Sequence, residues 1–483
     1  MTSGGRGRVP WAGRALQPGV RAGTAARGAR PVVPLSGWPV LAPMVAYLLW
    51  WLAGVGDMIW LIAAAAMLYQ WLGSRDLGIP RSLLLWGLFL VWCVASMVMI
   101  DTTGRLIGAV YRLLFYAAAG CVAIHTYSAR RALPLTRVTG AMTWFLACMT
   151  AGGYLALAMP ELVIRTPMSW VVPQGLASNE LVADMIVRRT TQWSPDLWEP
   201  QAVRPAAPFL YANTWGNVYS LVLPIAVLHL WLTRGARWWW AWVAVVAASV
   251  IPAVSTLNRG MFIGLGVVGA WAALQAVRRG RVLIVLAGVV ITPLAGALWI
   301  ASPSGQSLLH RLESTNSTVD RALLYRLTLE GALDSPLFGY GAPRPAPDPW
   351  LPSLGTQGQL WTVLYSNGFV GTALFLGCLL SVLTLAWRRT DPVGAVMGGV
   401  VAATVVETTY YGMMTGLMVT MVAVGLVLRP DTAVVPDRMT GSATGRATGR
   451  AAAAGRRGAL SSPARRRRTA PTAASARPRR RRS

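Results

Sequence analysis

Lysine is absent from this 483-residue sequence, histidine occurs only three times and cysteine only four times. All 44 strongly basic side chains are therefore arginines. Alanine, glycine and proline are also abundant, so a codon preference explains part of this excess, and the positions of the arginines matter more than their number. The cysteines all lie within apolar runs and lack metal-ligand spacing, which argues against a disulfide framework and against a metal site. They are Cys93, Cys121, Cys148 and Cys378.

Several sequence motifs that are typical of a particular function are also missing. We find no Walker A loop, no dinucleotide-binding fingerprint, no HExxH zinc motif and no internal repeat. The first 37 residues are rich in arginine, glycine and proline and lack the apolar stretch of a cleavable signal peptide. The sequence therefore predicts no cofactor and no metal, and it predicts a disordered cytoplasmic arm at 1–37.

Long apolar runs dominate the remainder of the chain. Hydrophobic residues make up 54% of it, and runs of about 18 or more apolar residues recur, each long enough to cross a bilayer as a helix. The sequence therefore predicts an all-α polytopic membrane protein, with a membrane domain at 38–428 and about 12 transmembrane helices. We place these helices near 38–55, 57–73, 82–100, 106–126, 138–158, 214–233, 238–256, 260–276, 282–301, 357–387, 393–410 and 411–428.

The arginines also predict an orientation. With the N-terminus inside, 33 of the 44 arginines fall in cytoplasmic segments, as the positive-inside rule expects. This predicts a multi-pass protein of the plasma (inner) membrane, with both termini cytoplasmic and external loops at 159–213 and 302–356. The tail at 429–483 is predicted to be disordered and to bind anionic lipid through its arginines. Nucleic acid is the alternative partner for the tail, but the sequence has no folded nucleic-acid module.

Polar residues gather near the outer ends of the predicted spans. Arg259, in the segment STLNRGMF, lies at a tight turn where an arginine is costly unless it faces a cavity or a partner. Its guanidinium could bind a phosphate through two hydrogen bonds or reach lipid headgroups. Arg204 lies before PAAPF, close to the span with Asn213 and Asn217. Glu407 is an intramembrane carboxylate, which we expect to pair with an arginine of the site.

The second predicted loop carries the other candidates. It has helical periodicity at 318–332 and a Gly/Pro turn cluster at 335–348, which favours an ordered, functional loop over a disordered one. Arg321 and Arg326 are five residues apart and so lie on different helical faces. Each is a candidate phosphate ligand or an ordinary salt-bridge partner of nearby acids. The candidate acid–base groups of the loop are His310, Asp320 and Glu330.

Three segments together resemble the O-antigen ligase and O-antigen polymerase-like superfamily of membrane glycosyltransferases. STLNRGMFIGLGVVGAW resembles that family's Ser-x-x-x-Arg-Gly segment at the start of a span. RALLYRLTLEGALDSPLFGYG resembles its arginine, amphipathic helix and Pro-Leu-x-Gly-x-Gly segment. GTQGQLWTVLYSNGFVGTALF resembles the segment that returns into the membrane. The resemblance covers roughly 200–385, and the order of the three segments carries it.

The resemblance implies a GT-C-like helical bundle. It also implies transfer of a glycan from a polyprenyl-diphosphate carrier to the hydroxyl of a glycan or lipid acceptor at the outer membrane face, with no nucleotide required. Arginines would then stabilise the charge that develops on the diphosphate. Arg259 carries over as a diphosphate ligand and Arg204 more loosely. Arg321 and Arg326 are further candidates, with Asn213, Asn217 and Glu407 in supporting roles.

One position departs from this pattern. The ligases of the family have a histidine where this chain has Gln357, and glutamine cannot act as a general base, although its amide can orient a hydroxyl or a phosphate oxygen. The base would then be His310, Asp320 or Glu330, and the change favours a polymerase or an unassigned member. A transporter or flippase of lipid-linked glycans and a non-catalytic scaffold are the alternatives. The crowding of charged residues at the outer face favours the enzyme.

Overall fold

The structure, a computed structural model, describes residues 34–74, 77–177, 180–192, 203–282, 301, 306, 317–348 and 351–430. The predictions for the arm at 1–37 and the tail at 429–483 therefore lie almost wholly outside the described residues. So do the predicted span at 282–301, except for its two end residues, and the candidate base His310.

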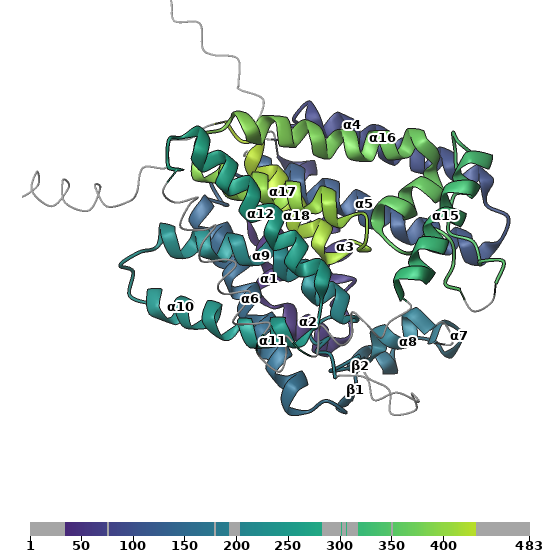
Figure 1. The fold of residues 1–483 in the computed structure, drawn as a ribbon, viewed down its shortest axis with the longest axis horizontal. Helices are drawn as coiled ribbons and strands as arrows, with labels where there is room; N and C mark the ends of the chain where they lie inside the picture. The colour runs from purple at the N-terminus through teal and green to yellow at the C-terminus, as the bar shows by residue number, and fades with distance from the viewer. Residues whose placement is uncertain are drawn as a thin grey trace, which may run out of the picture. The chain divides into compact units, whose positions relative to one another are not determined.

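Helices form most of the described chain (Figure 1). In chain order they are α1 (Trp38–Val45), α2 (Tyr47–Ala53), α3 (Ile59–Gly73), α4 (Ser82–Ser96), the 3-10 helix η1 (Met97–Met99), α5 (Thr103–Ser128), α6 (Leu135–Ala158), the 3-10 helix η2 (Pro167–Trp170), α7 (Gln174–Ala177), α8 (Glu180–Ile186), α9 (Ala212–Leu232), α10 (Trp239–Ala248), α11 (Val250–Ser255), α12 (Arg259–Arg278), α15 (Ser317–Asp334), α16 (Gln359–Arg388), α17 (Pro392–Glu407) and α18 (Thr415–Val427).

Six of the described helices are long and apolar enough to cross a membrane, which is consistent with the predicted all-α membrane class. They are α5, α6, α9, α12, α16, and α4 together with η1. Shorter apolar helices occupy Ile59–Gly73, Trp239–Ser255, Pro392–Glu407 and Thr415–Val427. The predicted span at 38–55 is divided into α1 and α2 at Ala46, whose backbone is not helical.

The first predicted loop contains structure that the all-α prediction did not include. Strands β1 (Val163–Arg165) and β2 (Val187–Arg189) pair antiparallel, with Ile164 opposite Arg188. Arg188 is 1% exposed, and its Nη2 donates to Asp57 Oδ2 at 2.9 Å. The hairpin is thereby fixed to the turn between α2 and α3, because separating this pair would leave a charged group buried without a partner.

A break in α16 positions the second predicted loop. Gly368 has φ +66°, a left-handed conformation that favours glycine, and it interrupts the helix. The carbonyls of Tyr365 and Ser366 accept hydrogen bonds from the N–H groups of Tyr340 and Gly341, at 2.9 and 2.8 Å. A Cβ atom at Gly368 would lie 2.3 Å from the carbonyl oxygen of Leu337, which is too close. The segment after α15 is therefore held against the opened backbone of α16, which fixes where α15 lies.

Helices α9, α12, α17 and α18 pack together (Figure 1). Glycines on these helices face polar side chains of the neighbouring helix. A Cβ atom at Gly264 of α12 would lie 1.7 Å from Glu407 Oε1 of α17, and one at Gly416 of α18 would lie 1.9 Å from Asn217 Oδ1 of α9. Small residues of this kind let helix backbones approach closely. The four helices therefore bring the start of α9, the start of α12 and the connection between α17 and α18 to one place.

Candidate functional site

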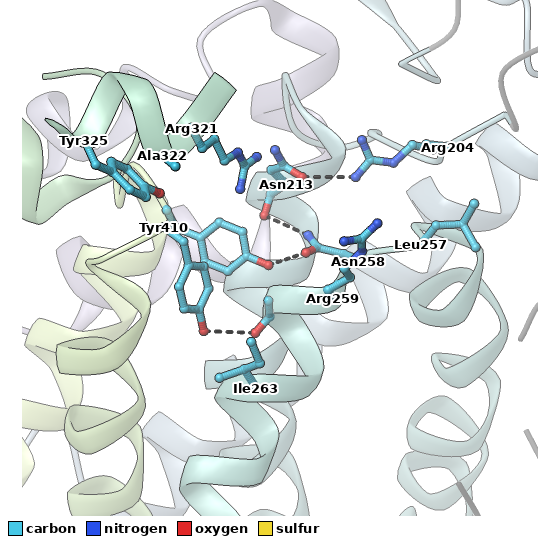
Figure 2. Close-up of a pocket in the computed structure, with 12 residues that line it drawn as sticks. Arg204, Asn213, Leu257, Asn258, Arg259, Ile263, Arg321, Ala322, Tyr325 and Tyr410 are labelled. Carbon is cyan, nitrogen blue, oxygen red and sulfur yellow. Dashed lines mark hydrogen bonds between the residues drawn. The ribbon is translucent and has the colours of Figure 1, made fainter. Parts of the chain in front are cut away.

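A pocket of about 400 Å³ lies where these helix ends meet α15. This volume is within the range of small-molecule sites. Three arginines line it, each from a different segment of the chain: Arg204 before α9, Arg259 at the start of α12, and Arg321 on α15 (Figure 2). Among the described residues that line the pocket, none is acidic. The arrangement therefore concentrates positive charge and hydrogen-bond donors in one cavity.

Arg204 is held in place by two neighbours. Its Nε donates to the carbonyl of Thr256 at 2.8 Å, and its Nη2 donates to Asn213 Oδ1 at 3.0 Å. Asn213 lies in the first turn of α9, and Thr256 directly follows α11, so the guanidinium connects two helix ends. These bonds fix the orientation of a planar donor group at the pocket wall, as a pre-organised anion ligand requires.

Asn258 anchors the turn that presents Arg259. Its side chain is 4% exposed; its Nδ2 donates to the carbonyls of Ala212 and Asn213 at 3.3 and 3.4 Å, and its Oδ1 accepts from the Tyr411 hydroxyl. A Cβ atom at Gly216 would lie 2.2 Å from Asn258 Nδ2, so glycine provides the space for this amide. Asn258 therefore ties the start of α12 to α9 and to the connection between α17 and α18.

Two features of the backbone around Arg259 bear on its role in the pocket. Leu257 has φ +49°, which is uncommon for a residue with a side chain and marks a position where the surrounding structure holds the backbone against a local preference. Arg259 is then the first residue of α12, a 20-residue helix. The N-terminus of a helix carries partial positive charge. The dipole of α12 therefore adds to the guanidinium charge in favouring a bound anion.

Helix α15 contributes Arg321 and Tyr325, which are four residues apart and face the pocket together. The Tyr325 hydroxyl donates to the carbonyls of Gln357 and Thr409, both at 3.3 Å, and its ring stacks on Trp361 with centroids 4.6 Å apart. Burial raises the pKa of the Tyr325 phenol, so this group stays protonated at neutral pH. The stack and the two hydrogen bonds fix α15 against the start of α16 and the connection between α17 and α18.

The predicted site residues divide into two groups. The pocket brings Arg204, Arg259, Arg321 and Asn213 together. Arg326, Glu330 and Gln357 are not among the described residues that line the pocket. Arg326 and Glu330 are largely exposed and form an ion pair with each other at 2.7 Å, which is the salt-bridge alternative of the sequence analysis. Asp320 lies within α15, but its side chain, like the whole of His310, is outside the described residues.

Glu407 and Asn217 form a separate buried cluster in the helical core. Asn217 Nδ2 and Ser220 Oγ donate to the two carboxylate oxygens of Glu407, each at 2.5 Å. The predicted pairing of Glu407 with an arginine is therefore wrong for the described residues. The physical reason is that Glu407 points inward toward α9, one turn before Tyr411, and two neutral donors satisfy its oxygens there.

Sequence reasoning missed the four other polar side chains that line the pocket, namely Asn258, Tyr325, Tyr410 and Tyr411. A signal was present, because the two adjacent tyrosines follow Glu407 within the segment ETTYYG. The hydroxyl of Tyr410 donates to the carbonyl of Gly260 at 3.1 Å, and a Cβ atom at Gly260 would lie 2.6 Å from that ring. The tyrosines therefore close the inner wall of the pocket against the start of α12.

No metal site is evident in this region or elsewhere in the part of the chain that the structure describes, where no three His, Cys, Asp or Glu residues are grouped closely enough to bind an ion. No known family model matches the sequence, and no curated protein matches it. The geometry of the pocket therefore carries the functional argument.

The hydrogen bond between Asn258 and Tyr411 makes a prediction about stability. We expect Asn258→Ala and Tyr411→Phe each to lower the free energy of unfolding by about 1–3 kcal/mol, because each leaves a buried polar partner unsatisfied. The double variant should lose less than the sum of the two, since both changes remove the same bond. Unfolding in detergent measures the cycle, with Tyr154→Phe as the control for an exposed hydroxyl. Additive effects would show that the bond contributes little.

Proposed function

We propose that this chain is an integral membrane protein that binds the diphosphate of a lipid-linked glycan in the pocket formed by Arg204, Arg259 and Arg321. We further propose that it transfers or polymerises the glycan onto an acceptor hydroxyl, as an O-antigen ligase or polymerase-like protein of cell-surface polysaccharide assembly. In this proposal the chain lies in the plasma membrane with both termini cytoplasmic, and the pocket opens toward the outer face.

One observation supports this proposal above the others. Three arginines that are separated by 55 and 62 residues in the sequence reach one cavity, beside a helix N-terminus. A guanidinium keeps its charge and matches a phosphate through two parallel hydrogen bonds. Three such groups suit a diphosphate, whose negative charge increases as the bond to the glycan breaks. The same groups would stabilise the departing lipid diphosphate, so the reaction would need no nucleotide.

The described lining also constrains the acceptor step. It offers guanidinium, amide and phenol groups, while a proton acceptor is needed for the attacking hydroxyl. Glu330 is engaged with Arg326 outside the pocket, and Gln357 meets Tyr325 through its backbone carbonyl. Asp320, next to Arg321, and His310 are the remaining candidates from the sequence. We therefore assign the base to Asp320 or His310 within this proposal.

Glycan transfer from a lipid-diphosphate donor, measured with the purified protein in lipid vesicles, tests the assignment. We expect Asp320→Asn or His310→Ala to lower the rate by about 100- to 10,000-fold, which is the usual contribution of a general base. Glu330→Gln and Gln357→His should change it by less than about fivefold, because these residues lie outside the proposed reaction path. A large gain in Gln357→His would instead place the base at position 357.

A carrier of lipid-linked glycans is the second candidate, and it is favoured because the described lining contains no carboxylate or imidazole that could act as a base. A carrier would use the same arginines but no base. Vesicles then distinguish the two functions, because a carrier moves the intact lipid-linked glycan across the bilayer and releases no free lipid diphosphate. Transport without release, unchanged in all four variants above, would replace the transferase by the carrier.

A further inference from the structure

The pocket of the three arginines has more room than a diphosphate needs. Its volume is about 400 Å³. At the roughly 30 Å³ that each water molecule occupies in the liquid, about 13 waters would fill it, whereas a diphosphate has only about nine non-hydrogen atoms. The groups bonded to the two ends of a diphosphate would therefore contact the pocket wall as well.

Tyrosines form the uncharged part of this wall. Tyr325, Tyr410 and Tyr411 line the pocket together with the three arginines (Figure 2). Each of these hydroxyls donates its proton to an oxygen of the protein, at 3.3 Å for Tyr325 and at 3.1 Å for Tyr410. What this wall offers a ligand is therefore mainly aromatic ring surface, whose negative face attracts C–H groups.

Tyr325 is a rigid part of the tyrosine wall. Its ring stacks on Trp361 with centroids 4.6 Å apart and an angle of 17° between the planes. The carbonyl of Thr409 accepts hydrogen bonds from both residues, at 2.9 Å from Trp361 Nε1 and at 3.3 Å from the Tyr325 hydroxyl. Trp361 is not among the described residues that line the pocket, so it supports Tyr325 from the side away from the cavity. A ligand that packs on this ring therefore does not have to order it first.

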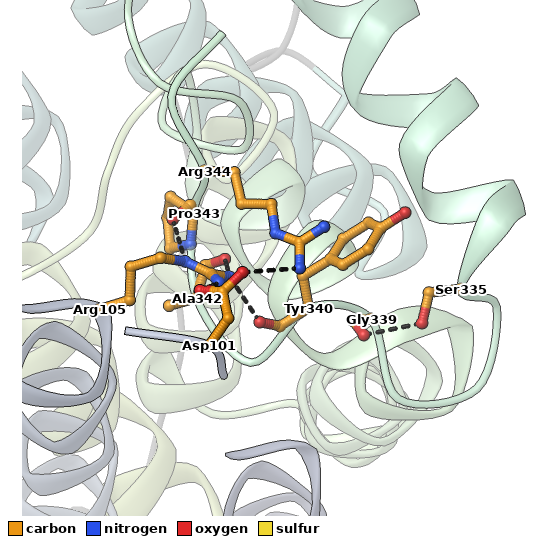
Figure 3. Close-up of polar contacts among 8 residues, drawn as sticks. All are labelled: Asp101, Arg105, Ser335, Gly339, Tyr340, Ala342, Pro343 and Arg344. Atoms are coloured by element: carbon orange, nitrogen blue, oxygen red, sulfur yellow. Dashed lines mark hydrogen bonds and ion pairs between the residues drawn. The ribbon is translucent and has the colours of Figure 1, made fainter. Parts of the chain in front are cut away.

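The segment that follows α15 is also held firmly, which keeps Tyr325 at the pocket. Arg105 of α5 donates to three carbonyls of this segment at 2.7, 2.8 and 3.1 Å, namely those of Tyr340, Ala342 and Pro343 (Figure 3). Asp101 pairs with Arg105 and also with Arg344 of the same segment. Helix α15 is therefore anchored to α5 beyond its C-terminal end and to α16 at Tyr325.

Ile263 marks a different end of the pocket. It lies one turn into α12, which is among the helices of membrane-spanning length, and it is 51% exposed although it lines the cavity. A Cβ atom at Gly266, on the next turn, would meet no atom within 4 Å. Helix α15, in contrast, is not among the described helices of that length and composition, and it carries the exposed pair of Arg326 and Glu330. The pocket therefore has an apolar end at α12 and an aromatic end on the polar helix α15.

We propose that the pocket binds a lipid-linked glycan in one orientation, with the first sugar against Tyr325 and the isoprenoid chain leaving over Ile263. This inference rests on the proposed function, because it takes the diphosphate to be held by the three arginines. A sugar ring presents C–H groups that pack on an aromatic ring and hydroxyls that stay near polar groups. An isoprenoid chain is apolar throughout, so it favours the end that is continuous with the apolar surface of α12.

Three ligands that differ by one group each test the orientation on the detergent-solubilised full-length protein. They are pyrophosphate, citronellyl diphosphate and citronellyl-diphospho-N-acetylglucosamine, with affinities measured by isothermal titration. The ratio of the first two affinities gives the gain from the isoprenoid, and the ratio of the last two gives the gain from the sugar. We expect Tyr325→Leu to abolish a sugar gain of about 3- to 10-fold and to keep the isoprenoid gain. Ile263→Ser should lower the isoprenoid gain by about 3- to 10-fold and keep the sugar gain.

Matched variants control the comparison. Tyr325→Phe keeps the ring and should keep the sugar gain. Leu274→Ser removes an exposed apolar side chain of α12 about 16 Å further along the helix and should keep both gains. Each gain is a ratio within one variant, so a lower folded fraction does not alter it.

The outcomes separate this inference from the proposed function. A sugar gain that survives in Tyr325→Leu, or a loss of the sugar gain in Ile263→Ser instead, overturns the orientation while pyrophosphate binding stands. Uridine diphosphate that binds more tightly than the sugar-bearing ligand, and loses this advantage in Tyr325→Leu, would make the ring a nucleotide site instead. A wild type that does not bind pyrophosphate at all refutes the proposed function, and the orientation with it.

Discussion

Replacing Arg259 with lysine is expected to weaken the binding of inorganic pyrophosphate by about 10- to 100-fold, although the charge is conserved. Lysine presents a single point of charge, whereas a guanidinium makes two parallel hydrogen bonds to phosphate. The loss of one hydrogen bond to a charged group costs about 1.5–3 kcal/mol, and each 1.4 kcal/mol corresponds to a tenfold change. Arg259 starts α12 at the pocket, and the turn anchored by Asn258 fixes its position. Isothermal titration of the detergent-solubilised protein measures the affinity.

Two variants control this experiment. Arg326→Lys makes the same chemical change on an exposed face of α15 and should leave the affinity within about twofold of the wild type, because exposed ion pairs contribute little. Arg259→Ala should bind more weakly than Arg259→Lys, since it removes the charge as well. Wild-type affinity in Arg259→Ala would remove this residue from the binding site.

The largest effect on stability is expected for Gly264→Ala. The new Cβ atom would lie 1.7 Å from Glu407 Oε1 and 3.0 Å from the Cβ of Ser220, so the carboxylate must leave its present position. Overpacking of this kind typically costs about 1–3 kcal/mol. The displaced carboxyl group also loses its bonds from Asn217 and Ser220, and leaving a buried polar group unsatisfied costs a further amount of about 1–3 kcal/mol. We therefore expect Gly264→Ala to fold poorly or to unfold at a much lower temperature.

Two glycines on the same helix provide the comparison. Gly266 and Gly269 meet no atom within 4 Å, so alanine there should be neutral or should stabilise α12 by about 0.5–1 kcal/mol. Thermal unfolding of the three variants in the same detergent measures the difference. Combining Gly264→Ala with Glu407→Ala should restore part of the loss, because the clash and the displaced carboxylate disappear together. Equal stability of all three alanine variants would show that Glu407 moves away without cost.

Much of the helical architecture followed from local patterns in the sequence. The long apolar runs predicted the helices that became α5, α6, α9, α12 and α16, because an uninterrupted apolar stretch must form its backbone hydrogen bonds within itself. The periodicity at 318–332 predicted α15, which the structure places at Ser317–Asp334. The break at Gly368 was not predicted, since it depends on the carbonyls of a distant turn approaching that residue.

The candidate site was only partly accessible from the sequence. Arg259 and Arg204 were selected because of their positions at span ends and their place in the motif order, and Arg321 was one of two candidates on α15. The choice between Arg321 and Arg326 depends on which face of α15 packs inward, and the stacking of Tyr325 on Trp361 decides it. The partners of Glu407 were also beyond local reasoning, since they lie about 190 residues away on α9.

The sequence by itself determined an all-α class with apolar helices of membrane-spanning length, and it determined which residues could bind an anion. Both properties are local, because helix formation and side-chain chemistry depend on a residue and its near neighbours. Only the tertiary structure decided that Arg204, Arg259 and Arg321 share one pocket and that Arg326 does not. Their convergence depends on glycines that let α9, α12, α17 and α18 approach closely, and such packing joins residues whose separation in the sequence carries no signal.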